Sequence, residues 1–261
     1  MEIKNICVVG GGRMGRQIAL NAAIYGYGAA VYDVNAAVLE DVKKWAGEYL
    51  AGRVAKGKLT AEQAEKVKSI FRVESDLARA CEGADCVIEA VVEIEDVKHK
   101  LFQQLDKVVG KDVILATNSS YMVSSLFKDC FANPSRLCNC HFYNPALVMK
   151  FVEVVQGEHT SDAVGAAVYE FCKSIGKTPI LMKKEISGFA ANRIISVINA
   201  EARYLVQNGY LTPQEVDIAC EQGLNHPMGP FRLMDLPGID LTYDLMKAGV
   251  AAGGEKPDCY D

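Results

Sequence analysis

The sequence predicts an α/β protein: a doubly wound, mainly parallel sheet followed by a smaller all-helical domain. Three observations predict this class. A glycine-rich turn joins the first apolar strand to a helix, short apolar strands then alternate with helical stretches to about residue 183, and no strand pattern follows. We therefore expect one domain over residues 1–183 and a second over residues 184–261.

The composition excludes several classes of protein. The chain has 261 residues, half of them hydrophobic, and a net charge of −5, so it can bury a large core and offers no basic surface for nucleic acid. No apolar run could span a membrane and no signal-peptide pattern is present, and the nine cysteines form no disulfide framework. We expect a cytoplasmic protein with no membrane partner. Cys138-x-Cys140-His141 matches no usual zinc spacing, so no metal is expected.

The N-terminal region carries a strand, a glycine-rich turn and a helix in immediate succession. Residues 3–9 are apolar, Gly10-Gly11-Gly12-Arg13-Met14-Gly15 follows, and a second strand over residues 29–32 ends on Asp33. A Gly-x-Gly-x-x-Gly turn in this position, with an acidic residue 23 positions after Gly10, is the context that a dinucleotide fingerprint requires. The pattern predicts a Rossmann-type domain.

Each residue of this fingerprint has a physical role. Gly10 forms the tight turn, Gly12 lets the backbone approach a pyrophosphate, and Gly15 allows the helix to pack closely on the strand. The N-terminus of the helix offers N–H groups to the phosphates. Asp33 can accept hydrogen bonds from ribose hydroxyls and would repel a 2′-phosphate. The sequence therefore predicts NAD, in preference to NADP, as the cofactor.

A charged helical hairpin is predicted directly after the second strand, within about residues 35–70. Its two helices flank Gly57-Lys58-Leu59-Thr60, and Thr60 with Gln63 predicts a capping box for the second helix. Such an insertion should project from the sheet. Arg53 and Lys56 lie near its tip, where charge alone indicates a solvated face at least as readily as a binding site.

The remaining strands place polar residues where strands end. Strands are predicted over residues 71–73, 84–90, 113–116, 137–140, 151–155 and 179–182. Thr117-Asn118-Ser119-Ser120 follows one of them, and ligands of such sheets bind beyond the carboxyl ends of strands. Ser120 could instead cap a helix that follows it.

His141 is the strongest candidate for a catalytic residue. It is one of four histidines, it ends a predicted strand, and Glu153 lies 12 positions later inside the next strand, beyond the turn at Asn144-Pro145. A histidine held by a carboxylate makes a good general base, because the anion fixes the tautomer and stabilises the imidazolium. A loop histidine beside an exposed glutamate is the simpler alternative.

Helices are predicted throughout the second domain. A long helix opens at Gly188-Phe189-Ala190-Ala191-Asn192-Arg193 and ends at Asn208-Gly209. Thr212-Pro213-Gln214-Glu215 begins another, Pro227-Met228-Gly229-Pro230 introduces a short one, and residues from 239 onward are expected to be helical again.

These motifs, in this order, resemble the 3-hydroxyacyl-CoA dehydrogenases, especially the short bacterial 3-hydroxybutyryl-CoA dehydrogenases. The resemblance covers almost the whole chain. It implies a doubly wound NAD domain, an all-helical domain that dimerises, and NAD-dependent oxidation of L-3-hydroxyacyl-CoA to 3-ketoacyl-CoA in fatty acid and butanoate metabolism. The partners implied are an acyl-CoA substrate and a second copy of the chain.

The resemblance also assigns roles. His141 falls on the family's catalytic base, Glu153 on its carboxylate partner, Ser120 on the serine beside the substrate hydroxyl, and Asn192 on a substrate-contacting asparagine. Arg53 and Lys56 fall where the family's hairpin meets CoA. Cofactor contacts are expected at Gly10, Gly12, Arg13, Met14, Gly15, Asp33, Glu93, Lys98 and Asn118.

The sequence departs from the family pattern in places. Gln17 stands where a small residue is usual, and Tyr121 could narrow the acyl pocket. The family's Arg-Lys-x-Gly-x-Gly-Phe-Tyr ending does not occur before Asp261, so we expect a truncated helical domain. Two alternatives remain open: a related dehydrogenase of a free hydroxy acid such as gulonate or carnitine, and a nucleotide-binding homologue without catalytic activity.

Overall fold

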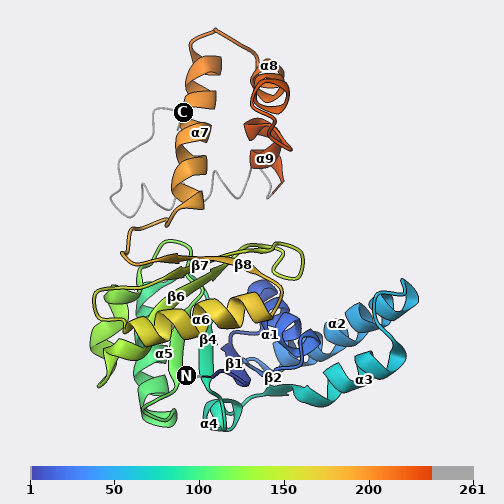
Figure 1. The fold of residues 1–261 in the computed structure, drawn as a ribbon, viewed down its shortest axis with the longest axis vertical. Helices are drawn as coiled ribbons and strands as arrows, with labels where there is room; N and C mark the ends of the chain where they lie inside the picture. The colour runs from blue at the N-terminus through green and yellow to red at the C-terminus, as the bar shows by residue number, and fades with distance from the viewer. Residues whose placement is uncertain (1, 237–261) are drawn as a thin grey trace. The chain divides into compact units, whose positions relative to one another are not determined.

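The computed structural model describes residues 2–236, and the chain divides into two compact units, Met1–Phe189 and Ala190–Asp261. The first unit is built on an eight-stranded sheet of order β3-β2-β1-β4-β5-β6-β7-β8 (Figure 1). All neighbouring strands are parallel except β6 and β7, which run antiparallel. The strands are β1 (Asn5–Val9), β2 (Gly28–Tyr32), β3 (Phe71–Glu74), β4 (Cys86–Glu89), β5 (Ile114–Thr117), β6 (Leu137–Phe142), β7 (Phe151–Val155) and β8 (Thr178–Met182).

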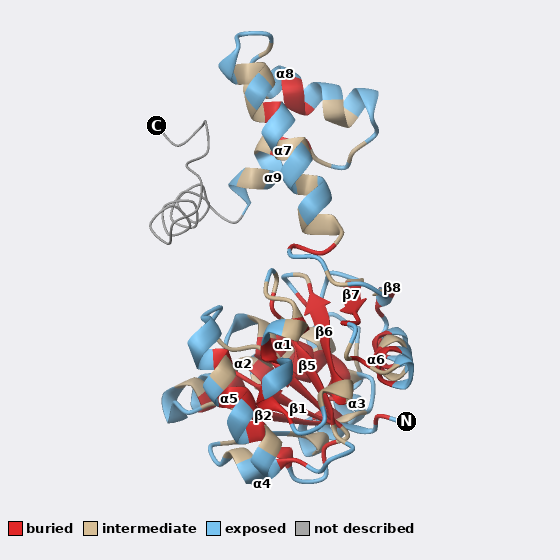
Figure 2. Cartoon of the chain, turned by 90° about the vertical axis from the view of Figure 1, so that its left-hand side faces the viewer, coloured by how far each residue is buried: buried red, intermediate tan, exposed pale blue. Residues whose placement is uncertain are grey.

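The central strands are apolar along their whole length because helices cover both faces of the sheet. Alternate residues of β1 point to opposite sides: Ile6 and Val8 join one core, and Cys7 and Val9 join the other. Figure 2 shows the buried strands at the centre of this unit. The first core also takes side chains from α1 (Arg13–Ile24), α2 (Ala36–Ala55), α3 (Ala61–Ile70) and α6 (Asp162–Ser174); the second takes them from α4 (Leu77–Cys81), α5 (Glu95–Val108) and the 3₁₀ helix η1 (Ser124–Cys130).

The predicted hairpin forms from α2 and α3, which project to one side of the sheet (Figure 1). The capping box predicted at the start of α3 is confirmed: the hydroxyl of Thr60 accepts from the amide of Gln63, and the side chain of Gln63 accepts from the amide of Thr60. These two bonds satisfy N–H groups that the first turn of a helix otherwise leaves unpaired. Each strand that the sequence predicts is also present.

The described part of the second unit, residues 190–236, contains helices and no strand. It comprises α7 (Ala191–Gln207), α8 (Pro213–Ile218), the π-helical turn η3 (Ala219–Gly223) and α9 (Pro230–Asp235). Thr212 and Glu215 form a capping box for α8, and the buried carboxylate of Asp217 accepts from the amide of Phe231 in the first turn of α9. The helix predicted from residue 239 lies outside the described residues.

Two global properties follow from the described residues. No helix among residues 2–236 is long and apolar enough to cross a lipid bilayer. The cysteines described are all free thiols, and most lie in the two cores. Cys138 and Cys140 are buried in β6, and no cluster of three or more potential metal ligands occurs among the described residues.

Candidate active site

The glycine-rich turn brings β1, α1 and β4 into close contact. Gly10 has a φ of 112°, and a Cβ added to it would lie 2.5 Å from the carbonyl oxygen of Ala90. A Cβ on Gly15 would overlap the carbonyl oxygen of Gly10, so both positions require glycine. A Cβ on Gly12 would meet no atom within 4 Å. The turn therefore leaves open space where the backbone can approach a ligand.

A pocket of about 650 Å³ opens at this end of the sheet, and its lining includes Gly10, Gly12, Arg13, Met14, Asp33 and Val91. The carboxylate of Asp33 is fixed in place because it accepts from the amide of Gly11 at 2.8 Å and from the amide of Asn35 at 2.9 Å. No side chain of the described residues caps the N-terminus of α1, so its positive end is open to an anionic group. Open space, a helix N-terminus and an anchored carboxylate together fit NAD.

His141 and Glu153 occupy directly opposed positions in the antiparallel pair of β6 and β7. His141 Nδ1 lies 2.9 Å from Glu153 Oε2, and His141 Nε2 lies 3.2 Å from the hydroxyl of Ser120. Glu153 is fully buried and His141 is 4% exposed. The carboxylate accepts only from a protonated Nδ1, so the lone pair of the neutral ring lies on Nε2. This arrangement can remove a proton from a group placed beside Ser120.

Two aromatic residues complete the surroundings of His141. The hydroxyl of Tyr143 donates a hydrogen bond to Glu153 Oε2 at 2.8 Å. Burial, together with this hydrogen bond, raises the pKa of Tyr143 well above its ordinary value. Phe189 is fully buried, with its ring centre 5.4 Å from that of His141. Phe189 also has a φ of 51°, in the left-handed region that favours glycine. Neither residue is expected from the sequence to act at the site, although Phe189 lies in the motif that opens the long helix.

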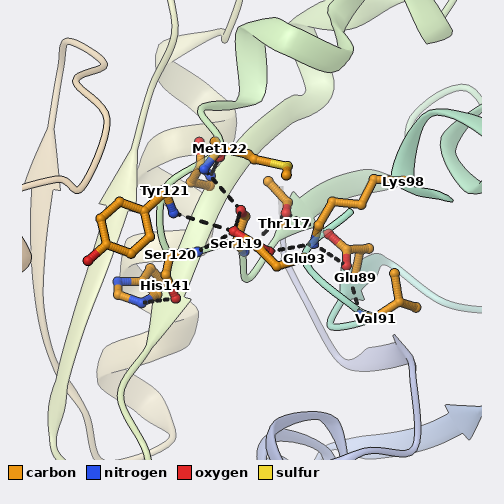
Figure 3. Close-up of polar contacts among 11 residues, drawn as sticks. Glu89, Val91, Glu93, Lys98, Thr117, Ser119, Ser120, Tyr121, Met122 and His141 are labelled. Atoms are coloured by element: carbon orange, nitrogen blue, oxygen red, sulfur yellow. Dashed lines mark hydrogen bonds and ion pairs between the residues drawn. The ribbon is translucent and has the colours of Figure 1, made fainter. Parts of the chain in front are cut away.

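A buried ionic network lies beside Ser120 (Figure 3). The ammonium group of Lys98 is 2.7 Å from Glu89 Oε1 and 3.1 Å from Glu93 Oε2. The hydroxyl of Thr117 donates to Glu89 Oε2 at 2.6 Å. Glu89 is fully buried and Lys98 is 1% exposed. The fully buried pair of Lys98 and Glu89 is therefore balanced within the protein, as buried charges must be, and Glu93 adds a partly exposed carboxylate.

Glu93 connects this network to the loop that carries Ser120. Its Oε1 accepts from the Ser119 hydroxyl and, at 3.1 Å, from the amide of Ser120. Burial opposes ionisation of Glu93, but the Lys98 ammonium and the Ser119 hydrogen bond prevail and hold its pKa below the ordinary value. Ser120 is thus anchored on one side through its backbone and directed at His141 on the other.

The family is shown by comparison with known proteins. A model of the NAD binding domain of 3-hydroxyacyl-CoA dehydrogenase matches residues 5–186, and a model of the C-terminal domain of the same enzymes matches residues 188–260. The chain belongs to the 3-hydroxyacyl-CoA dehydrogenase family.

Individual relatives agree with this assignment. A protein described as a probable 3-hydroxybutyryl-CoA dehydrogenase, from Bacillus subtilis (strain 168), is 36% identical over 247 residues, which cover 95% of this chain and 85% of the relative. The crystal structure of (S)-3-hydroxybutyryl-CoA dehydrogenase from Ralstonia eutropha has a TM-score of 0.88 and 32% identity, covering 94% of this chain and 86% of that chain. A diketoreductase structure is similar at a TM-score of 0.88 and 30% identity, covering 94% and 87%.

The other residues expected in this 3-hydroxyacyl-CoA dehydrogenase lie in different parts of the chain. Asn118 accepts from the amide of Phe142 at 2.9 Å and so ties the end of β5 to the end of β6. Arg53 lies in the last turn of α2 and Lys56 is the C-cap residue of that helix. Both therefore belong to the projecting hairpin. Asn192 lies in the first turn of α7, in the second unit.

The structure also places Gln17 and Tyr121, the two residues that depart from the family pattern. Gln17 is buried in α1 and its side-chain oxygen accepts from the amide of Leu147 at 3.3 Å, which joins α1 to the segment after the Asn144-Pro145 cis bond. Tyr121 is 58% exposed, and its carbonyl oxygen accepts from the hydroxyl of Ser187 at 2.9 Å. Ser120 does not cap a helix, because η1 begins four residues later, at Ser124.

Proposed function

We propose that His141 is the general base of an NAD-dependent L-3-hydroxyacyl-CoA dehydrogenase that favours short acyl chains. One observation carries this assignment: His141 is hydrogen-bonded to a buried carboxylate through Nδ1 and to Ser120 through Nε2. Family membership supports the reaction, and the resemblance to 3-hydroxybutyryl-CoA dehydrogenases supports a short substrate.

Oxidation of the substrate removes a proton from the C3 hydroxyl oxygen and a hydride from carbon C3. His141 Nε2 takes the proton of the C3 hydroxyl, while the Glu153 carboxylate stabilises the imidazolium that forms. When bound, NAD supplies the acceptor of the hydride from C3. In the reverse direction the His141 imidazolium protonates the oxygen on C3 of the 3-ketoacyl group as carbon C3 gains the hydride.

Neighbouring residues supply orientation. Ser120 lies within hydrogen-bond distance of His141 Nε2, so the substrate hydroxyl can be held between them. We assign Asn192 to the substrate carbonyl side and Arg53 and Lys56 to CoA, on the family resemblance. Glu93, Lys98 and Asn118 lie around the Ser120 loop, which suits them to shape the nicotinamide end of the cofactor site.

The wider organisation is also part of the proposal. We infer that residues 1–183 form the NAD domain and residues 184–261 a helical domain for substrate binding and dimerisation, as the family resemblance implies. The free buried thiols of the described residues and the bacterial relatives support a cytoplasmic location.

Acetoacetyl-CoA-dependent oxidation of NADH tests the function, followed as the loss of NADH absorbance. NADPH and free acetoacetate are run in parallel, because the structural relative named a diketoreductase is described as acting on dicarbonyl compounds. We expect rapid turnover that requires both NADH and the thioester. Equal turnover of free acetoacetate would favour a dehydrogenase of free acids, and NADH binding without any turnover would favour a non-catalytic homologue.

A further inference from the structure

We infer that Tyr143 is a positioning residue that controls how strongly Glu153 holds the protonated form of His141. Resting on the proposed function, this inference adds a third member to the pair of His141 and Glu153. Tyr143 acts through the carboxylate, and its hydroxyl need not touch the substrate.

The inference depends on one atom, Glu153 Oε2, which accepts hydrogen bonds from both His141 and Tyr143. Glu153 Oε2 is 2.9 Å from His141 Nδ1 and 2.8 Å from the hydroxyl of Tyr143. Two hydrogen-bond donors at nearly equal distances therefore share the same carboxylate oxygen. Glu153 is fully buried, so its carboxylate is shielded from bulk solvent and its hydrogen-bond donors come from within the fold.

The ring of Tyr143 is held on both sides, which fixes the direction of its hydroxyl. Its centre lies 4.6 Å from the ring of His141 and 5.3 Å from the ring of Phe151. Replacement by phenylalanine keeps both ring contacts and removes only the donor. The raised pKa of Tyr143 means that the phenol remains a donor across the neutral range.

Sharing Oε2 changes the chemistry of His141 in a defined direction. A phenol that donates to the carboxylate draws negative charge toward itself, so less remains to stabilise an imidazolium at Nδ1. Tyr143 thereby favours the neutral ring, which is the form that accepts the substrate proton. Without the Tyr143 hydroxyl, the protonated form of His141 is more stable. As the pH falls, the base of the oxidation reaction is then protonated, and so inactivated, at a higher pH than in the wild-type protein.

Other charged or titratable groups near His141 are few among the described residues. Glu153 faces it from β7, and the ring of Tyr121 lies near it in the loop after β5 (Figure 3). Glu93 lies behind Ser120 and shares the ammonium group of Lys98 with Glu89, so this cluster keeps one net negative charge. Lys177 donates to the carbonyl oxygen of Met149 at 3.1 Å, in the segment between β6 and β7. Of these groups, Glu153 is the one that accepts the hydrogen bond of the Tyr143 hydroxyl.

The pH profile of kcat/KM for oxidation of 3-hydroxybutyryl-CoA by the Tyr143→Phe variant of the 261-residue chain tests the inference. We expect the acid limb of the profile to move to higher pH by roughly 0.5 unit, which is about a threefold loss of kcat/KM on that limb. A structural role alone would lower kcat at all pH values and leave the limb in place. Tyr27→Phe is the matched control, because Tyr27 also bonds through its hydroxyl, to Ser174, and packs on a phenylalanine, Phe171.

A titration of the His141 imidazole by NMR gives an independent measurement that needs no turnover. The chain has four histidines, so a His141→Gln spectrum assigns the signal. The titration midpoint should rise in Tyr143→Phe and should not change further when the same substitution is added to Glu153→Gln. Tyr143→Leu serves as a second variant if Tyr143→Phe does not fold.

The inference would be overturned if the acid limb of the kcat/KM profile of Tyr143→Phe stayed in place or moved to lower pH. It would also be overturned if the shift in the His141 titration midpoint persisted in the Glu153→Gln background. Failure of the proposed function has a different signature: the wild-type chain itself would then show no thioester-dependent turnover.

Discussion

His141 and Glu153 lie directly opposite each other across the antiparallel strands β6 and β7, with His141 Nδ1 2.9 Å from Glu153 Oε2. Strand pairing thus fixes the relative position of these two side chains, because residues opposed in an antiparallel ladder point to the same face of the sheet. A shift of one residue in this register would turn Glu153 to the other face and leave His141 without its carboxylate.

Glu153→Gln should therefore lower kcat on the order of 100-fold or more while KM for the cofactor changes little. The amide keeps the size of the side chain but no longer stabilises the imidazolium. Steady-state kinetics with acetoacetyl-CoA and NADH provide the measurement. Glu158→Gln, an exposed neighbour, is the control. Equal activity of the two variants would contradict the role of Glu153.

Asp33→Ala should raise KM for NADH by about tenfold or more and reduce the preference over NADPH. The carboxylate lies in the pocket at the glycine-rich turn, where it accepts from the amide of Gly11 at 2.8 Å. Asp41→Ala removes an exposed carboxylate of α2 and should leave both values unchanged. If both variants kept the wild-type preference for NADH, Asp33 would not be the residue that selects the cofactor.

Lys98→Met should lower the free energy of unfolding by about 3–5 kcal/mol, because it leaves the buried carboxylate of Glu89 without its counter-charge. Adding Glu89→Gln should restore part of that loss. Denaturant unfolding measures both variants. Lys43→Met removes an exposed ion pair on α2 and should change stability by less than about 1 kcal/mol. Additive losses in the double variant would argue against the pairing.

The stability of the protein should fall at acid pH partly through Glu93. Its pKa is held below the ordinary value of 4.5, so the folded state favours the charged form. The stabilisation from this carboxylate is present above the unfolded-state pKa and is lost as the pH falls through the lower, folded-state value. Glu93→Gln should therefore lose less stability on acidification than the wild-type protein. Urea midpoints at neutral pH and at a pH below 4.5 measure the difference, and equal losses would contradict it.

The sequence predicted the cofactor half of the molecule well, for a physical reason. The turn from Gly10 to Gly15 and the acidic residue Asp33 are set by local geometry, since a tight turn and a close helix contact both require glycine. The strand positions followed from apolar runs that are buried on both faces.

The polar contacts were harder to predict because they depend on distances across the fold. The sequence places His141 and Glu153 on successive strands, but their register depends on the path of the connecting segment, residues 143–150. The pairing of Lys98 with Glu89 depends on α5 folding back over the end of β4, which no local pattern specifies. The hydroxyl of Tyr143 likewise gives no signal in the sequence.

The turnover of His141→Gln, with the Kd for NADH measured on the same sample, tests the central claim most directly. His99→Gln, a histidine of α5 that bonds to Cys130, is the control. We predict a loss of about 10²–10⁴-fold in kcat for His141→Gln with NADH binding nearly unchanged. Near-normal turnover of His141→Gln would contradict the claim that this residue is the base.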